Sequence, residues 1–266
     1  MLQLWPPSLD ELRSFGPLPD LWTVLWRGAY PRIHDRAIPA DRWLSDYFAT
    51  YVQRDVRQLL QIGDLNTFST FVRLVAARTS AELNLSSLGG DAGVSHNTAR
   101  AWLSVLEASH LLFQLPPWHA NPRKRLVKAP KVHMCDSGLA CWLLGIRSPA
   151  ELEHHPLRGA IFESWVASEA AKAFIHAGQA PPLAHWRETR GFEVALVIAR
   201  GARPRLVEVK SGQTAATDAV SRLAEAARAT GCDAWLLHGG DVRQPRTDVD
   251  VRGWGTLSDA AWLGAS

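Results

Sequence analysis

The stretch LVEVKSG, Leu206 to Gly212, places two charged residues inside an otherwise apolar strand. Side chains alternate between the two faces of a strand, so Glu208 and Lys210 project to one side and the valines beside them to the other. A buried ion pair adds little net stability, because desolvating both charges offsets most of their attraction. The pair therefore indicates a functional site, and the surrounding fold decides what that site can do.

The segments around this strand have the order expected of a mixed α/β (α+β) domain. A long amphipathic helix comes first, three strands follow, and a second helix leads into a last strand. The six segments are RGAIFESWVASEAAKAFIHAG (158–178), LAHWRE (183–188), FEVALVIA (192–199), RPRLVEVK (203–210), DAVSRLAEAARATG (218–231) and DAWLLHGG (233–240). This α-β-β-β-α-β order predicts a small mixed sheet within residues 136–266.

The preceding region, residues 41–135, is predicted to be helical and to contain a helix-turn-helix. A short apolar helix ends at Gly93, which permits a tight turn, and Ser95 can then cap a second helix. Two strand-like runs follow, at 111–115 and 132–134. Two strands after the second helix, joined by a loop, turn the motif into a predicted winged helix.

Contacts to DNA are expected from two parts of this unit. Polar residues on the second helix would meet base edges, and the basic loop between the strands would meet phosphates. The expected residues are His96, Asn97 and Arg100 on the helix and Arg123, Lys124, Arg125, Lys128 and Lys131 in the loop, which holds no acidic residue. Winged helices also act as protein-interaction or spacer modules, and a basic loop is often a solvated turn, so both interpretations stay open.

The C-terminal pattern resembles the PD-(D/E)XK nuclease superfamily, which carries E-x-K on its third strand. The resemblance implies that Glu208 and Lys210 match this motif, and that Glu163 matches an assisting glutamate on the preceding helix. In such nucleases two carboxylates hold Mg²⁺, which polarises the phosphoryl oxygen and lowers the pKa of water. The catalytic candidates are therefore Glu163, Glu208 and Lys210.

One position departs from that superfamily. Related sequences read G-x-E-V-D where this chain reads Gly-Phe-Glu-Val-Ala, so Ala195 stands in place of the metal-binding aspartate. Glu193 shares its strand face, but residues two apart in a strand are separated by roughly 6.5 Å, which one extra methylene does not span. We therefore expect weak Mg²⁺ binding and no metal site beyond a marginal role for Glu208.

Longer segments extend the resemblance from Leu18 to about Leu257. The segments WRGAYPRI, YVQRDVRQLLQIGDL, LEASHLLFQLPPWHANPRKRLVKAPKVHMCDSGLA and HPLRGAIFESWVASE look like the C-terminal region of a family of prokaryotic AAA-type P-loop ATPases. The resemblance implies an ATPase subunit or domain as a partner, with residues 1–40 as a linker similar to the end of an ATPase core. The P-loop motif G-x-x-x-x-G-K-[ST] is absent, so we expect no ATP site, and either a truncated gene product or a fragment of a longer protein.

Two motifs of this resemblance have structural interpretations. Arg54 and Asp55 in YVQRDV are predicted to lock two helices together, with contact to a nucleotide or a neighbouring subunit as the alternative. Asp136 in CDSGL is predicted to cap a helix.

The bulk composition is that of an ordinary globular protein. The chain has 266 residues, a net charge of +3, three cysteines and no apolar run long enough to span a membrane. The unpaired cysteine and the absence of a signal peptide indicate a reducing compartment, so we expect a cytoplasmic protein with buried thiols and no membrane partner.

The sequence thus predicts a non-catalytic nucleic-acid-binding or protein-docking module that needs no cofactor and has DNA as a candidate partner. One alternative is a weak Mg²⁺-dependent DNA nuclease that uses Glu163, Glu208 and Lys210. Another is a structural remnant with no partner.

Overall fold

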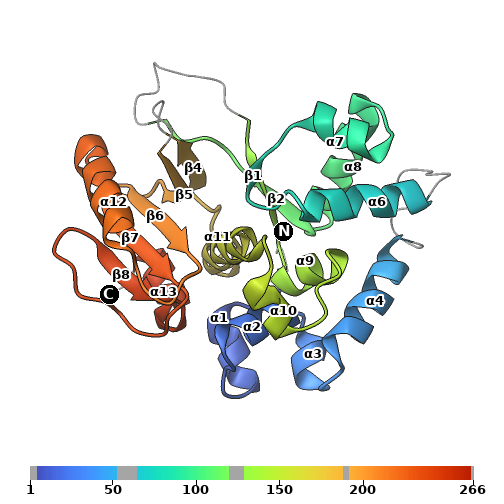
Figure 1. The fold of residues 1–266 in the computed structure, drawn as a ribbon, viewed down its shortest axis with the longest axis horizontal. Coiled ribbons are helices and arrows are strands. Elements are labelled where there is room, and N and C mark those ends of the chain that lie inside the picture. Colours follow the sequence, from blue (N-terminus) through green and yellow to red (C-terminus); the bar gives the residue numbers. More distant parts are fainter. Residues whose placement is uncertain (1–4, 53–64, 120–128, 188–191, 265–266) are drawn as a thin grey trace.

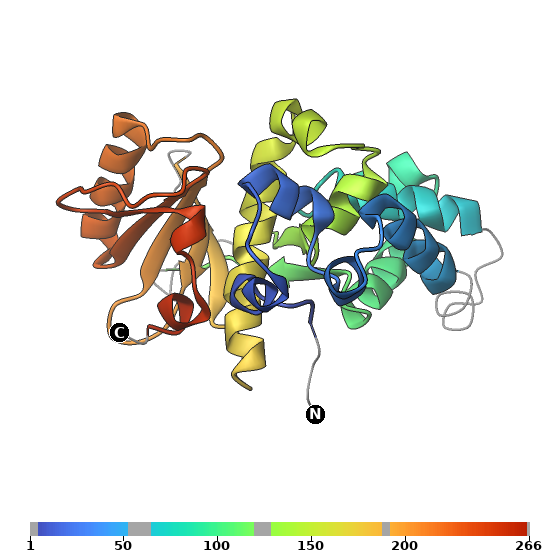
Figure 2. The ribbon, with the colours of Figure 1, turned by 90° about the horizontal axis from the view of Figure 1, so that it is seen from below.

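The computed structural model describes residues 5–52, 65–119, 129–187 and 192–264. A mixed sheet lies at one side of the molecule and a helical half at the other (Figure 1). The long helix α11 (Arg158–His176) runs between them, as the view from below makes clear (Figure 2). The combination of helices and sheet confirms the predicted α/β class.

The helical half contains short helices and one small sheet. Its elements are α1 (Leu9–Leu12), the 3-10 helix η1 (Arg13–Phe15), α2 (Leu21–Arg27), α3 (Pro31–Asp35), α4 (Ala40–Thr50), α6 (Leu65–Ala76), β1 (Ala81–Glu82), α7 (Leu85–Ala92), α8 (His96–Ala108), β2 (Leu112–Leu115), β3 (Lys131–Met134), α9 (Ser137–Leu143) and α10 (Pro149–His154). Strands β1, β3 and β2 form an antiparallel sheet in that order.

Two helices joined by a tight turn, α7 and α8, lie where the sequence predicts a helix-turn-helix. Asn84 accepts a hydrogen bond from the backbone of Ser87 at 3.0 Å and so begins α7. Gly93 ends that helix in the left-handed region, at φ +72°. Ser95 then accepts from the Thr98 backbone N–H at 3.1 Å, which fixes the first turn of α8. Buried apolar side chains hold the two helices together, among them Leu88, Trp102 and Leu106.

The C-terminal half follows the predicted α-β-β-β-α-β order and adds a strand. Its elements after α11 are β4 (Leu183–Arg187), β5 (Glu193–Ile198), β6 (Arg205–Lys210), α12 (Thr217–Thr230), β7 (Asp233–His238), β8 (Asp250–Gly253), the 3-10 helix η3 (Trp254–Thr256) and α13 (Asp259–Leu263). The sheet order is β4-β5-β6-β7-β8. Strands β4 to β6 run antiparallel, whereas β6, β7 and β8 run parallel. The sequence did not predict β8.

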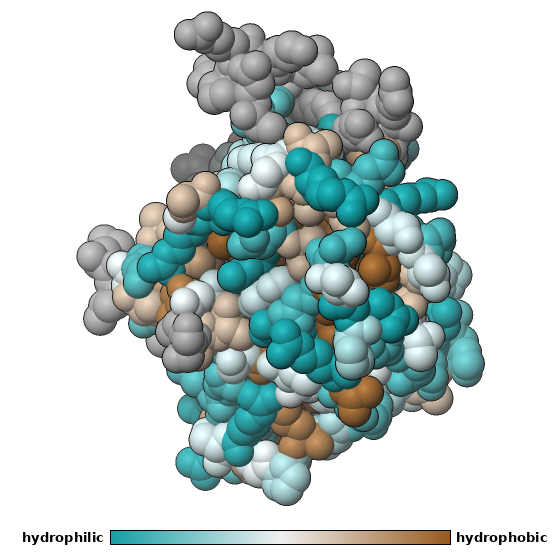
Figure 3. Space-filling model, turned by 90° about the vertical axis from the view of Figure 1, so that its left-hand side faces the viewer, coloured by the Kyte–Doolittle hydropathy of each residue, from teal (hydrophilic) through white to brown (hydrophobic). Residues whose placement is uncertain are grey.

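Two hydrophobic clusters cover the faces of this sheet. Val207, Val209 and Leu237 pack with α11 on one side. Leu206 and Leu236 pack with α12 on the other, as the alternation of strand side chains requires. The side of the molecule that carries α12 and the β7–β8 connection is mostly hydrophilic (Figure 3).

The segment predicted as a linker, 1–40, contributes to the core wherever it is described. Trp5, Leu9 and Leu25 are buried in the cluster formed by α11 and the sheet. In Figure 2, α1 lies against α11, close to α13. The N-terminal segment is therefore packed on the C-terminal half.

A short bridge joins the two sheets. The chain that leaves β2 pairs with β4, because His185 donates its backbone N–H to Pro116 O at 2.9 Å and accepts from Trp118 N at 2.7 Å.

Three free cysteines, Cys135, Cys141 and Cys232, are buried, which confirms the expected thiols. No helix in the described ranges has both the length and the apolar character needed to cross a bilayer.

Candidate functional site

Glu208 and Lys210 lie together on β6, as the strand alternation predicts. Their charged atoms Oε1 and Nζ are 2.6 Å apart, with the glutamate side chain 8% exposed and the lysine side chain 50% exposed. Burial raises the pKa of Glu208, and the charge of Lys210 acts in the opposite direction. The pair therefore combines a buried carboxylate with a cation that reaches solvent.

Glu163 comes to the same place from α11, but its partner is unexpected. The ammonium of Lys131, at the start of β3, lies 2.8 Å from Glu163 Oε1 and also pairs with Glu193 of β5. The Lys131 side chain is only 3% exposed. Burial opposes its charge, yet the two carboxylates outweigh this effect and raise the pKa of Lys131. An internal ammonium therefore neutralises two of the acidic groups of the site.

The expectation that Lys131 would contact phosphates as part of the basic loop is wrong. Lys131 pairs with Leu115 and Glu82 in the small sheet, and this register turns its side chain toward α11 and β5. Two carboxylates from distant parts of the chain then hold it. Nothing in the residues next to Lys131 signals this, because its partners lie 32 and 62 positions further along the chain.

The position occupied by Ala195 offers no ligand to a cation. Its methyl group is buried, at 4% exposure, and its backbone N–H points to Glu208 Oε2 at 3.4 Å. Glu193 does not replace the missing carboxylate, since it is engaged by Lys131. No group of three or more His, Cys, Asp or Glu side chains within the described ranges is arranged to hold a metal ion. These residues do not fit a Mg²⁺ centre.

The five charged side chains line one cleft between the two halves of the molecule. Its volume is about 830 Å³, and its walls come from the segment after α6 and from β1, β3, α11, β5, β6 and α12. Besides the charged groups already described, it is lined by Thr79, Ser80, Phe192, Asp218 and Arg222, among others. Such a volume is within the range of small-molecule and cofactor sites.

The predicted DNA-contacting residues of α8 lie apart from this cleft. His96, Asn97 and Arg100 are all exposed at the start of α8. This helix lies at the outer end of the helical half, far from α12 (Figure 1). Other expected residues fall outside the described ranges: Arg54, Asp55, Arg123, Lys124, Arg125 and Lys128.

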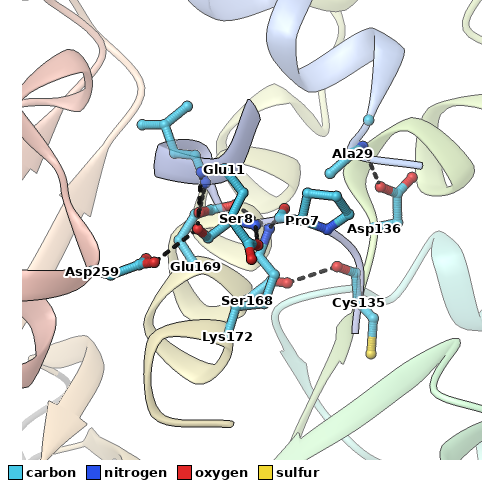
Figure 4. Close-up of polar contacts among 12 residues, drawn as sticks. Pro7, Ser8, Glu11, Ala29, Cys135, Asp136, Ser168, Glu169, Lys172 and Asp259 are labelled. Carbon is cyan, nitrogen blue, oxygen red and sulfur yellow. Dashed lines mark hydrogen bonds and ion pairs between the residues drawn. The ribbon is translucent and has the colours of Figure 1, made fainter. Parts of the chain in front are cut away.

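A buried polar network that the sequence did not reveal holds the N-terminal segment (Figure 4). Glu169 and Lys172 of α11 are both 1% exposed and form an ion pair with each other. Lys172 also donates to Pro7 O at 2.9 Å, and Glu169 accepts from Leu9 N at 2.7 Å. Ser8 donates to the Asp259 carboxylate at 2.9 Å. Both members of the ion pair therefore also form a hydrogen bond with the backbone of the N-terminal segment.

Asp136 caps α9, which confirms its predicted role. It accepts from the Leu139 backbone N–H at 2.7 Å. Its second oxygen accepts from Ala29 N, also at 2.7 Å, so the same carboxylate fastens the chain after α2 (Figure 4).

Comparison with known proteins identifies two domain families in this chain but assigns no activity to them. Residues 18–150 match a family described as domain of unknown function DUF8612, and residues 158–255 match the domain of unknown function DUF4143, an AAA-ATPase-associated domain. Two similar relatives are the uncharacterized proteins Rv2008c of Mycobacterium tuberculosis (strain ATCC 25618 / H37Rv) and Mb2031c of Mycobacterium bovis (strain ATCC BAA-935 / AF2122/97). Each is 31% identical over 173 residues, which cover 65% of this chain and 38% of the relative.

The chain thus spans well under half the length of these curated relatives. No solved structure matches it. Since the first of the two family models covers half of the sequence, the chain belongs to the DUF8612 family.

Proposed function

We propose that this chain is a non-catalytic nucleic-acid-binding module. The observation that carries the proposal is the first turn of α8, where His96, Asn97 and Arg100 are exposed side by side on the second helix of a helix-turn-helix. Asparagine and arginine form bidentate hydrogen bonds with base edges in the major groove, which is wide enough to admit a helix.

The elements around α8 support this assignment. Strand β1 precedes α7, and β2 and β3 follow α8 to complete an antiparallel sheet. This arrangement resembles a winged helix, whose wing is the loop between the last two strands. The basic residues of that loop would supply phosphate contacts.

The absence of catalysis is inferred from the charges in the cleft. A nuclease of the resembled type needs carboxylates that are free to hold Mg²⁺. Here Ala195 supplies none, Lys131 engages Glu163 and Glu193, and Lys210 engages Glu208. We infer that these ion pairs maintain the joint between β3, α11 and β5.

The proposed module would act with an ATPase. The support is the match of residues 158–255 to an AAA-ATPase-associated domain, together with relatives that are much longer than the matched region. We propose an ATPase subunit or domain as its protein partner.

A binding assay tests the α8 contact. Fluorescence anisotropy with a labelled DNA duplex would compare the wild type with the triple variant His96→Ala, Asn97→Ala, Arg100→Ala. Loss of bidentate base contacts, at about 1–3 kcal/mol each, is expected to raise Kd at least tenfold. The control is Arg36→Ala, which removes one exposed arginine remote from α8. Equal affinity of the triple variant and the control would refute the α8 contact.

The alternative of a weak Mg²⁺-dependent nuclease has one observation in its favour, since Glu163, Glu208 and Lys210 do line the same cleft. It predicts nicking of plasmid DNA in Mg²⁺ or Mn²⁺ that disappears in Glu208→Ala. It also predicts that Lys131→Met, which frees two carboxylates, increases the nicking. The non-catalytic proposal predicts no metal-dependent nicking by the wild type.

A further inference from the structure

A second charged surface lies at the opposite end of the sheet from Glu208. A groove of about 860 Å³ opens where β6 and β7 begin, and its walls come from α12, the start of both strands and the β7–β8 connection. Its charged lining consists of Arg203, Arg205, Arg228, Arg243, Arg246, Asp233, Asp248 and Asp250. We call this the arginine groove. It lies at the other end of the molecule from α8 (Figure 1).

Arg205 lines this groove and stacks on an aromatic ring. Its guanidinium lies 3.8 Å from the centre of the Trp235 ring, and that of Arg252 lies 3.9 Å from the same ring centre. Burial and the neighbouring charge of Arg252 lower the pKa of Arg205. Its Nε is buried and has no hydrogen-bond partner within the described part of the chain. Arg252 is neutralised by Asp250, whose carboxylate lies 2.6 Å from its guanidinium. Arg205 lines the groove and forms no ion pair within the described part of the chain, so its charge favours an anion there.

Three of the remaining arginines form ion pairs from exposed positions, among them Arg243, which lies 2.8 Å from Asp250 with 66% of its side chain exposed. Arg203 and Arg228 face Asp233 and Asp248 at 3.3 and 3.4 Å, with 64% and 68% of their side chains exposed. Exposed pairs of this kind contribute little and are easily exchanged. Arg246 donates to the Pro245 carbonyl at 2.9 Å and has no carboxylate partner in the described structure. The five arginines of the lining thus outnumber its three aspartates.

We propose that the arginine groove binds the phosphodiester backbone of a nucleic acid. Guanidinium groups match phosphate oxygens in a bidentate geometry, and a row of them suits a repeating anion. An acidic peptide would also need an apolar anchoring pocket. The aromatic side chain here, Trp235, is 6% exposed and already covered by two arginines. The described lining of the groove therefore offers charge without an exposed aromatic anchor.

Binding of nucleic acid by the arginine groove does not depend on binding by α8, and one set of variants tests the two sites separately. The groove variant is Arg203→Gln, Arg243→Gln, Arg246→Gln, and its charge-matched control is Arg32→Gln, Arg36→Gln, Arg42→Gln, three exposed residues of the helical half. Affinity for labelled single-stranded and duplex DNA is measured by anisotropy at several salt concentrations. Thermal unfolding verifies that each variant folds, and the single variant Arg246→Gln avoids disturbing any ion pair.

The groove variant is expected to bind single-stranded DNA at least tenfold more weakly than its control. The slope of log K against log salt should fall by about 2, because three phosphate contacts are lost. Arg246→Gln alone should lower it by about 0.7. If the groove variant loses affinity for DNA and the α8 triple variant binds DNA like the wild type, the result supports the groove and refutes the α8 contact. Loss in the α8 variant alone would refute the groove.

A competition arm tests the class of ligand. Poly-glutamate and inorganic phosphate are added to the protein–DNA complex at equal anion concentration. If unlabelled DNA displaces the labelled DNA at matched ionic strength while poly-glutamate and inorganic phosphate do not, the result supports binding of the phosphodiester backbone. Displacement by poly-glutamate as effective as by unlabelled DNA would overturn it in favour of an acidic polypeptide, and saturable binding of inorganic phosphate without DNA binding would overturn it as well.

Discussion

The buried pair Glu169–Lys172 gives the sharpest test of how the N-terminal segment is held. Replacing Lys172 by Met keeps the apolar stem of the side chain but removes the ammonium. The Glu169 carboxylate then stays buried at 1% exposure, with Leu9 N as its remaining hydrogen-bond donor. The Pro7 carbonyl also loses the donor that lies at 2.9 Å.

Removing one partner of a buried ion pair costs about 3–5 kcal/mol, because an uncompensated charge remains. For a chain of this size each kcal/mol shifts the thermal midpoint by about 2–4 °C, so a fall of roughly 6–20 °C is expected. Urea unfolding followed by the fluorescence of the 12 tryptophans measures the same loss as a free energy. Limited proteolysis should also cut residues near Pro7 sooner in the variant, because this segment loses an anchor.

The double variant Glu169→Gln, Lys172→Met removes both charges of this pair, so we expect it to be more stable than Lys172→Met by at least about 1 kcal/mol. A pH series adds a second check. Burial raises the pKa of Glu169, and without Lys172 the pKa rises further, so the folded variant holds a proton that the unfolded chain releases. Stability of the variant is then lost as pH rises through that folded-state pKa, and its deficit relative to wild type shrinks toward acid pH. A deficit below 1 kcal/mol, or one independent of pH, would refute the reasoning.

Three further predictions concern other buried groups. Lys131→Met should destabilise the protein by about 1–3 kcal/mol in urea, because two partly exposed carboxylates lose their shared cation, and Lys131→Arg should restore part of the loss. Acidification should destabilise the fold: burial lowers the folded-state pKa of His133 and His185, so the unfolded chain takes up protons first as pH falls below about 6.5, and the urea midpoint should drop between pH 7.5 and 5.5. His133→Phe should reduce this pH dependence. Gly28→Ala should cost more than about 2 kcal/mol, because its new methyl group would overlap the buried carboxylate of Asp136. Gly201→Ala, with a similar positive φ but no atom within 4 Å, should cost only the backbone strain of about 1–2 kcal/mol, and thermal melts of the pair measure the difference.

The local parts of the fold follow from the sequence because their signals are local. Gly93 and Ser95 define the end of one helix and the start of the next within three residues, and the structure uses both as expected. The alternation in LVEVK likewise places Glu208 and Lys210 on one face of β6. Strand β8 was missed because its four residues, DVRG, carry only one β-branched side chain and pair at an edge.

The candidate site was only half predictable for a different reason. Its charges come from β3, α11, β5 and β6. When two residues of an ion pair lie so far apart in the chain, the sequence around one of them does not indicate the other. Lys131 looks like one of several loop cations in the sequence, yet the register of β3 buries it between two glutamates. The attachment of Leu9 and Pro7 to α11 is equally remote, since the bonded residues lie 160 and 165 positions apart.

The bridge at His185 has a consequence for self-association. An outermost strand normally presents a row of unpaired amides and carbonyls onto which another chain can add. On β4 part of this row is already closed by Pro116 and Trp118. Before a second copy could add a strand to β4, the first copy would have to break these two hydrogen bonds and move its own segment at Pro116 and Trp118 aside. The chain itself therefore disfavours fibre-like association through β4.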